Sequence, residues 1–420
     1  MPIFTNIEAL ANPYPHFKKL RQESPVYFDQ DLQMYVLSKH CDVTTALTDT
    51  NSFSSGQALF SSYNHEDIVN KILIEKAHGP FAEVLPMTDP PRHTRVRALV
   101  NGAFSAKRVS KIQSYIDTVT EELFDNIEGK SQAEIVSELA VPLPVAIIAH
   151  MLCVPRERSE DIKRWTEYYS ACACNRLSSE EEATLAGEHL AEMQNYIVAH
   201  LEERRANPGD DVLTDLINAR TGDGQEPLTN KEILATSAAF LGAGHETSTV
   251  AITHAFRYLA MYPEELKRIQ NADDMDAAIR IFCEELLRLE PPTRSLLRVS
   301  LADTVMSGVS IPAGSLIMIL TGSANRDEDV FGENADVFDS TRSSTRKHVS
   351  FGAGVHMCIG NMLARAELKQ VVKAIALRFD KIDLANKNPG IEDFHPVVMP
   401  INFQPNKLQV NFEKIKSAVA

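Results

Sequence analysis

The 420-residue sequence lacks any run of about 18 uncharged apolar residues, the length that a membrane-spanning helix requires. Its first residues, MPIFTNIEALANPYPHF, also lack the basic stretch and apolar core that are typical of a secretory signal. We therefore expect a cytoplasmic protein without a membrane span.

Cysteine and basic residues are both scarce. The six cysteines are scattered at positions 41, 153, 172, 174, 283 and 358, a spacing that fits neither a disulfide framework nor paired zinc-binding motifs. The 42 Lys and Arg residues stand against 57 Asp and Glu residues, which gives a net charge of −15. A nucleic-acid-binding protein needs a basic face, so this balance argues against a nucleic-acid partner.

Linkers, internal repeats and low-complexity tracts are absent from the sequence. Hydrophobic residues make up 44% of the chain and charged residues 24%, an ordinary globular mixture that leaves enough apolar surface for a large core. The sequence therefore predicts one domain over residues 1–420, which we expect to be a monomer.

Helical periodicity dominates between residues 89 and 290, while strand patterns are short. A short helix is predicted in residues 12–22, and residues 25–38 alternate apolar and polar side chains around a polar turn, as in a hairpin. A second β region, with two strands around turn residues, is expected in residues 295–320, and a C-terminal strand in residues 407–412. The predicted fold class is mainly α with a minor β region.

One long helix is predicted between residues 229 and 262. Thr229 and Glu232 have the spacing of a capping box, and Pro263 marks the far end, so the helix has about 32 residues. Its length is on the order of 48 Å, and its middle is apolar on nearly every face, as in a helix that is buried on all sides. That middle contains Gly-Ala-Gly-His-Glu-Thr at residues 242–247.

A glycine-rich loop with a cysteine precedes the last predicted helix. Residues 351–360 read Phe-Gly-Ala-Gly-Val-His-Met-Cys-Ile-Gly. Glycine lets the backbone adopt positive φ and approach a flat ligand closely, and a cysteine just ahead of a helix N-terminus is favoured as a thiolate. The alternative interpretation is a glycine-rich turn with a buried cysteine.

The spacing F-G-x-G-x-H-x-C-x-G resembles the cysteine loop of the cytochromes P450, and the similarity to soluble bacterial members covers nearly the whole chain. The resemblance implies a single-domain, prism-shaped haem-thiolate fold with haem b, iron protoporphyrin IX, between the long helix and the helix after the cysteine. It also implies that Cys358 is the thiolate ligand of the iron, and that Gly244, Phe351 and Gly352 contact the haem.

Glu285 and Arg288 stand at i and i+3 on a predicted helix that Pro291 ends, so they can pair on one face. By themselves they would be an ordinary surface ion pair. They resemble the E-x-x-R motif of the family, in which an arginine upstream of the cysteine loop completes a triad. Arg342 occupies that position, and the resemblance implies that the triad is structural.

His93 and Arg97 lie four residues apart on one face of a predicted helix, where they could hold a carboxylate or form a solvated basic face. The family resemblance implies that they bind the haem propionates together with Arg298 and His356. Arg92 stands where the family usually has an acidic residue, which makes this surface more basic.

The central residues 243–247 of the long helix resemble the oxygen-binding A-G-x-[DE]-T motif. Glycine in a helix interior costs about 0.5 to 1 kcal/mol relative to alanine, and room for a ligand would justify Gly242 and Gly244. The resemblance implies that Glu246 and Thr247 deliver protons to bound dioxygen; alternatively, the Thr247 hydroxyl only bonds back to the carbonyl four residues earlier. His245 is expected to be structural.

The implied activity is a monooxygenase reaction in which RH, O2, two electrons and two protons give ROH and water. No flavin or iron–sulfur segment is present, so the electrons of NAD(P)H would arrive through a separate ferredoxin and ferredoxin reductase. Two alternatives remain open: a haem-binding sensor or carrier without turnover, and a peroxide-driven oxygenase.

A small apolar organic substrate is expected, because the residues that the resemblance assigns to the pocket are small or apolar. They are Ala239, Phe240, Ala243, Leu296, Leu297 and Ile401. A cluster of basic residues is expected on the face nearest the cysteine, where it would dock an acidic ferredoxin. Its members are Arg92, Arg95, Arg346, Lys347 and Arg365.

Overall fold

The computed structural model describes residues 4, 9, 11–58, 64–81, 83–173, 176–222, 224, 226–386, 394–397 and 402–415. The chain forms two compact units. Unit 1 consists of Met1–Phe53, Lys111–Pro144 and Thr247–Ala420, and unit 2 consists of Ser54–Ser110 and Val145–Glu246. One domain over residues 1–420 stays a prediction.

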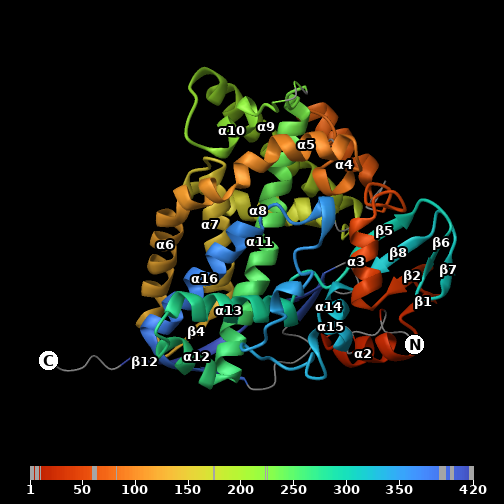
Figure 1. The fold of residues 1–420 in the computed structure, drawn as a ribbon. Coiled ribbons are helices and arrows are strands. Elements are labelled where there is room, and N and C mark those ends of the chain that lie inside the picture. The colour runs from red at the N-terminus through yellow and green to blue at the C-terminus, as the bar shows by residue number, and fades with distance from the viewer. Residues whose placement is uncertain are drawn as a thin grey trace. The chain divides into compact units, whose positions relative to one another are not determined.

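Helices are the main regular secondary structure of the chain (Figure 1). Those within unit 1 are α2 (Tyr14–Glu23), α3 (His40–Thr48), α12 (Pro263–Gln270), α13 (Met275–Leu289), α14 (Thr321–Ala324), α15 (Glu328–Phe331) and α16 (Asn361–Arg378). Unit 2 contains α4 (Glu66–Lys76), α5 (Arg92–Val100), α8 (Ser159–Ala173), α9 (Glu180–Ala206) and α10 (Val212–Asn218). Three helices run through the boundary between the units: α6 (Ala106–Glu128), α7 (Pro142–Met151) and α11 (Asn230–Met261).

The predicted long helix is α11, which has 32 residues. Its start is the expected capping box, because the Thr229 amide donates to the Glu232 carboxylate at 2.9 Å and the Glu232 amide donates to the Thr229 hydroxyl at 3.2 Å. The next helix, α12, begins at Pro263, where the long helix was expected to have ended. The predicted short helix is α2.

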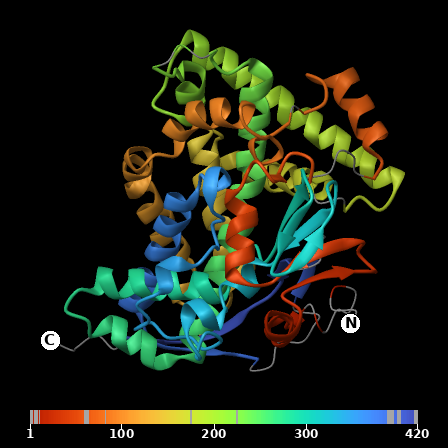
Figure 2. The ribbon, with the colours of Figure 1, turned by 45° about the vertical axis from the view of Figure 1, so that its right-hand side comes forward.

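The larger sheet has the strand order β1-β2-β8-β5-β3. Its strands are β1 (Val26–Asp29), β2 (Met34–Leu37), β3 (Phe53–Ser54), β5 (Leu296–Ser300) and β8 (Leu316–Ile319). The predicted hairpin is confirmed, since β1 pairs antiparallel with β2. Strand β8 then runs parallel to β2 and antiparallel to β5 (Figure 2, red and cyan arrows).

The second β region contains four strands where two were expected. In addition to β5 and β8, β6 (Thr304–Met306) and β7 (Val309–Ile311) form a separate hairpin. Ser307 and Gly308 both have positive φ, 43° and 81°, which is the geometry of a tight hairpin turn. This two-residue turn divides a run that the sequence pattern reads as one strand.

The remaining strands form two small sheets. Strands β4 (Gln132–Glu134), β12 (Gln409–Lys414) and β9 (Phe379–Leu384) form one in that order, and β10 (Phe394–Val397) pairs with β11 (Asn402–Pro405) in the other. The predicted C-terminal strand corresponds to β12. No helix among the described residues is long and apolar enough to cross a membrane.

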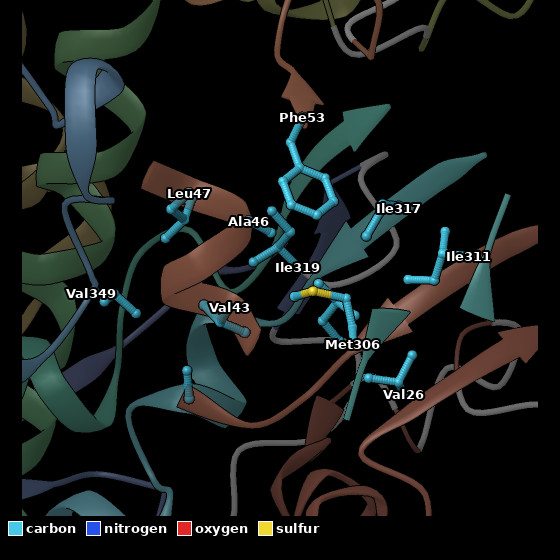
Figure 3. Packing of buried hydrophobic residues seen from close by; sticks show 12 residues of the cluster. Val26, Val43, Ala46, Leu47, Phe53, Met306, Ile311, Ile317, Ile319 and Val349 are labelled. Carbon is cyan, nitrogen blue, oxygen red and sulfur yellow. The ribbon is translucent and has the colours of Figure 1, made fainter. Parts of the chain in front are cut away.

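A buried apolar cluster in unit 1 connects the larger sheet to the segment before the cysteine (Figure 3). Val43 and Leu47 of α3 pack with Ile317 and Ile319 of β8, and Val349 belongs to the same cluster. Each fully buried aliphatic side chain contributes roughly 1.5–3 kcal/mol. Because Val349 lies two residues before Phe351, this packing fixes the start of the cysteine loop.

Candidate haem-binding and oxygen-activating site

The cysteine loop is a closed turn ahead of α16. The Cys358 amide donates to the Phe351 carbonyl at 2.7 Å, and the half-buried Cys358 lies two residues before Gly360, the residue that precedes the helix. The positive end of the helix dipole there favours a negative charge on sulfur. The loop therefore holds its sulfur where a thiolate is stabilised.

Two glycines in this loop have the positive φ that L side chains rarely adopt, +69° at Gly352 and +67° at Gly354. A Cβ at Gly354 would lie 2.9 Å from the Leu47 carbonyl oxygen and 3.0 Å from Thr48 Cα. Close packing of the loop against α3 therefore requires glycine at this position.

The donor set at Cys358 suits a metal that already has other ligands. The described residues hold no group of three or more His, Cys, Asp or Glu side chains that could bind a bare metal ion. A single thiolate can serve as the protein ligand of an iron whose other ligands come from a prosthetic group, as in a haem. The residues present fit that group.

Asn325 ties the loop to the body of unit 1, and sequence reasoning missed it. Its side chain accepts from the Val349 amide at 2.7 Å and donates to the Ser350 hydroxyl at 2.8 Å. Ser350 in turn donates to the Leu287 carbonyl at 2.7 Å. A pattern search does not find these contacts, because the partners lie 24 to 63 residues apart.

Glu284 joins α13 to both sides of the loop and was also missed. Arg365 donates to its carboxylate at 2.6 Å, and His348 lies 3.1 Å from the same group. Burial opposes ionisation of Glu284, but the hydrogen bonds from His348 and Arg365 outweigh it and lower the pKa of this carboxyl to about 2. The Arg365 guanidinium also lies 4.2 Å from the centre of the Phe351 ring.

Glu285, Arg288 and Arg342 are in contact in unit 1. Arg288 and Glu285 have no exposed side-chain surface and form two hydrogen bonds of 2.7 and 2.8 Å, and Arg342 donates to Glu285 at 3.3 Å. Arg288 also donates to the carbonyls of Asn325 and Ala335, both at 2.7 Å. Removing one partner would leave a buried charge, at a cost of roughly 3–5 kcal/mol.

The four residues expected at the haem propionates divide between the units. In unit 2, His93 is buried on α5, and Arg97 follows one turn later with its Nε donating to Asn101 at 2.8 Å. Burial and the nearby Arg97 lower the pKa of His93. In unit 1, Arg298 is buried on β5, and His356 lies in a short turn of helix two residues before Cys358. Their chemistry, cationic or hydrogen-bond donating, suits carboxylates.

The middle of α11 carries a stripe of accessible residues in an otherwise buried stretch. Ala243 and Thr247 are exposed and Ala239 and Phe240 half-buried, whereas Leu241, Gly242, Ser248 and Thr249 are buried. Residues at i, i+4 and i+8 lie on one face of a helix. Ala239, Ala243 and Thr247 therefore form one accessible face at the oxygen-binding motif.

The two glycines of α11 have packing reasons that sequence reasoning did not anticipate. A Cβ at Gly242 would lie 2.5 Å from the Tyr169 ring, and one at Gly244 would lie 2.6 Å from Ile148 Cδ1. That Gly242 and Gly244 also make room for a ligand stays a prediction. They let side chains of α8 and α7 approach the backbone of α11.

Glu246 and His245 have different surroundings. In unit 2 the half-buried Glu246 accepts a hydrogen bond of 3.4 Å from Arg176, which is also half-buried. Burial, with a minor contribution from Lys163, lowers the pKa of His245 to about 4, so this imidazole is neutral at pH 7. A neutral His245 fits the structural role expected for it.

Glu367 is a buried carboxyl that sequence reasoning missed. It lies on α16 and is 1% exposed, and burial raises its pKa to about 8. The Ser248 hydroxyl is its polar neighbour, yet neither carboxyl oxygen makes a hydrogen bond of normal geometry. The signal was present in the sequence, because Glu367 stands four residues from both Leu363 and Val371 in an apolar helical stripe.

The expected pocket residues outside α11 differ in burial. Leu296 is half-buried at the edge of the apolar cluster, whereas Leu297 is 4% exposed. Neighbouring residues of a strand point to opposite faces, so Leu296 and Leu297 lie on different faces of β5, and their place in a substrate pocket stays a prediction. Ile401 lies outside the described residues.

The residues of the expected basic cluster divide between the two units, and three of them form ion pairs with glutamates. In unit 2, Arg92 pairs with Glu83 and Arg95 with Glu232. In unit 1, Arg365 pairs with Glu284, while the exposed Arg346 and Lys347 form no ion pair with a described residue.

Comparison with known proteins supports the resemblance. The family model described as Cytochrome P450 matches residues 4–410. The biotin biosynthesis cytochrome P450 of Bacillus subtilis is 30% identical over 382 residues, which cover 90% of this chain and 92% of that protein. The erythromycin C-12 hydroxylase of Saccharopolyspora erythraea is 32% identical over 391 residues, 92% of each protein.

The fold agrees with solved structures of this family. The cytochrome P450 CYP109Q5 from Chondromyces apiculatus superposes with a TM-score of 0.83 at 30% identity, covering 99% of this chain and 98% of that one. The predicted mainly α fold with a minor β region is confirmed. The chain therefore belongs to the cytochrome P450 family and is a haem-thiolate monooxygenase.

Proposed function

We propose that Cys358 would be the thiolate ligand of a haem b iron and that this chain hydroxylates a small apolar organic substrate. The observation that carries the proposal is the closed cysteine loop, in which the Cys358 amide donates to the Phe351 carbonyl and the half-buried sulfur precedes α16. When bound, the haem supplies dioxygen binding and cleavage, and the thiolate donates electron density for it. The overall reaction converts RH, O2, two electrons and two protons to ROH and water.

Glu246 and Thr247 are the proposed proton-handling pair. Thr247 is exposed on the accessible face of α11, where its hydroxyl can hold a proton donor next to the reacting molecule. Glu246 directly precedes Thr247 in the helix and accepts a hydrogen bond from Arg176 at 3.4 Å. As a general acid–base group it would exchange protons with solvent. A swing of Glu246 between Arg176 and Thr247 would then move protons inward.

His93, Arg97, Arg298 and His356 are the proposed partners of the two propionates. Arg298 is held in place by its own hydrogen bond to the Leu297 carbonyl at 2.7 Å. Gly244, Phe351 and Gly352 are proposed to lie against the haem plane. These roles would place cationic or hydrogen-bond-donating groups at the carboxylates and apolar or backbone atoms at the ring.

The electron donor is proposed to be a ferredoxin, reduced by an NAD(P)H-dependent ferredoxin reductase. Within the expected basic cluster, Arg346 and Lys347 are exposed in unit 1 and are the proposed contacts for an acidic partner, whereas Arg365 is engaged by Glu284. A cytoplasmic location and a monomeric state stay predictions.

Turnover with surrogate ferredoxin and reductase under 18O2 tests the proposal. The expected result is a product that carries one 18O atom per molecule and depends on NAD(P)H. A carrier without turnover would consume no NAD(P)H beyond the background rate, and a peroxide-driven enzyme would take its oxygen from added peroxide.

A further inference from the structure

Tyr169 of α8 lies directly against the backbone of α11 in unit 2. A Cβ at Gly242 would come within 2.5 Å of Tyr169 Cδ1 and 2.9 Å of Cε1, closer than non-bonded atoms approach. The absence of a side chain at Gly242 therefore sets the position of the Tyr169 ring. The ring is half-buried, so part of its surface stays accessible.

Gly242 borders the accessible face of α11. With 3.6 residues per turn, Ala239 and Ala243 share the centre of this face, Gly242 lies on one flank and Phe240 on the other. Both alanines have short side chains, so groups on the two flanks define the width of the space above them. One flank carries the Tyr169 ring and the other the half-buried Phe240 ring.

Tyr169 and Phe240 each pack against a second aromatic ring of unit 2. Phe81 packs against Tyr169 with ring centres 5.6 Å apart and planes at 86°, and it is half-buried. Phe104 packs against Phe240 with ring centres 4.2 Å apart and planes at 64°. Edge-to-face pairs of this kind hold each ring in a defined orientation.

From this arrangement we infer that Tyr169, placed by Gly242, together with Phe240 selects an aromatic or planar polycyclic substrate over a saturated or linear aliphatic one. This inference rests on the proposed function and names the substrate class of that same site. Ring faces and edges attract the complementary edges and faces of another π-system, whereas a saturated ring of equal size gains only apolar burial. The short side chains of Ala239 and Ala243 would leave room between the two rings for a planar molecule.

The test uses iron-binding probes that differ only in the tail. Imidazole carrying a naphthylmethyl group and its fully saturated decahydronaphthylmethyl counterpart are titrated into the haem-loaded protein, and the Soret shift gives each dissociation constant. Wild type is expected to bind the naphthyl probe more tightly, although the saturated tail is the more hydrophobic. Loss of one edge-to-face contact in Tyr169→Leu should reduce the naphthyl preference about three- to tenfold.

Three further variants make the result specific. Tyr169→Phe keeps the ring and should keep the preference for the naphthyl probe. Gly242→Ala must displace the ring and should reduce that preference, so it still tests the inference if Tyr169→Leu fails to fold. Gly102→Ala is the matched control in unit 2, because a Cβ there meets no atom within 4 Å. Unsubstituted imidazole should bind all variants equally.

Equal binding of both probes to wild type, or an unchanged preference in Tyr169→Leu and Gly242→Ala, would overturn the inference while the proposed function stands. Purified protein that takes up no haem, or shows no shift with imidazole, would instead overturn the proposed function.

Discussion

Arg365 lies over the Phe351 ring at 4.2 Å and donates to Glu284 at 2.6 Å, so one side chain joins the helix after the cysteine to the loop before it. Arg365→Ala would remove the cation–π contact and leave the part-buried Glu284 with one partner fewer. We expect a loss of roughly 1–3 kcal/mol in stability of the haem-bound protein.

Thermal unfolding followed at the Soret band measures this loss. Lys373→Ala is the control, because Lys373 also lies on α16 but makes only an exposed ion pair with Asp276. Equal midpoints for Arg365→Ala, the control and wild type would contradict a structural role for Arg365.

Thr247→Ala should separate electron consumption from product formation. The variant removes the hydroxyl on the accessible face of α11 and keeps a strong helix former. Haem and substrate binding should persist while electrons pass to hydrogen peroxide or water. Coupling of NAD(P)H use to product at the wild-type level would show that Thr247 only bonds within its own helix.

Glu367 should make stability depend on pH. Its folded-state pKa of about 8 exceeds the ordinary value of 4.5, so the folded protein binds one more proton than the unfolded chain between these pH values. The contribution of Glu367 to the free energy of unfolding is therefore fully present below pH about 4.5 and is lost as the pH rises to about 8. The free energy of unfolding falls by up to about 1.4 kcal/mol per pH unit in this range because of this site. Glu367→Gln, which cannot ionise, should remove that part of the slope.

Urea unfolding of wild type and Glu367→Gln at a series of pH values checks this prediction. Glu333→Gln, at an exposed glutamate, should leave the slope unchanged. Parallel stability curves for wild type and Glu367→Gln would mean that this carboxyl is ionised in the folded protein.

Charge reversal at Arg346 and Lys347 should slow the first electron transfer from ferredoxin. Exposed charges steer encounter more than they alter chemistry, so the rate and its salt dependence should both fall. The measurement is stopped-flow reduction over a salt series, with Lys71→Glu in α4 as the control. Arg365→Glu is unsuitable for this purpose, since it would break the contact with Glu284.

Local sequence signals predicted the elements that depend on residues close together in the chain. The capping box at Thr229 and the proline at 263 define α11, and glycine spacing identifies the cysteine loop. Glu285 and Arg288 were found because one helical turn separates them.

The contacts that support the loop could not be predicted in this way. Arg365 and Glu284 are 81 residues apart, and nothing in the local pattern pairs them. Glycine is required at position 242 because the ring of Tyr169, on another helix, lies against the backbone there. That Leu296 and Leu297 lie on opposite faces of β5 was predictable, however, because side chains alternate along a strand.

The most direct test of the account is the absorption spectrum of the reduced protein with carbon monoxide. Wild type should show the long-wavelength Soret band that thiolate-ligated haem gives and after which the family is named. Cys358→Ser replaces the sulfur with an oxygen of similar size and should move or abolish this band, whereas Cys283→Ser, at a buried cysteine of α13, should keep it. An unchanged band in Cys358→Ser would contradict the assignment of Cys358 as the iron ligand.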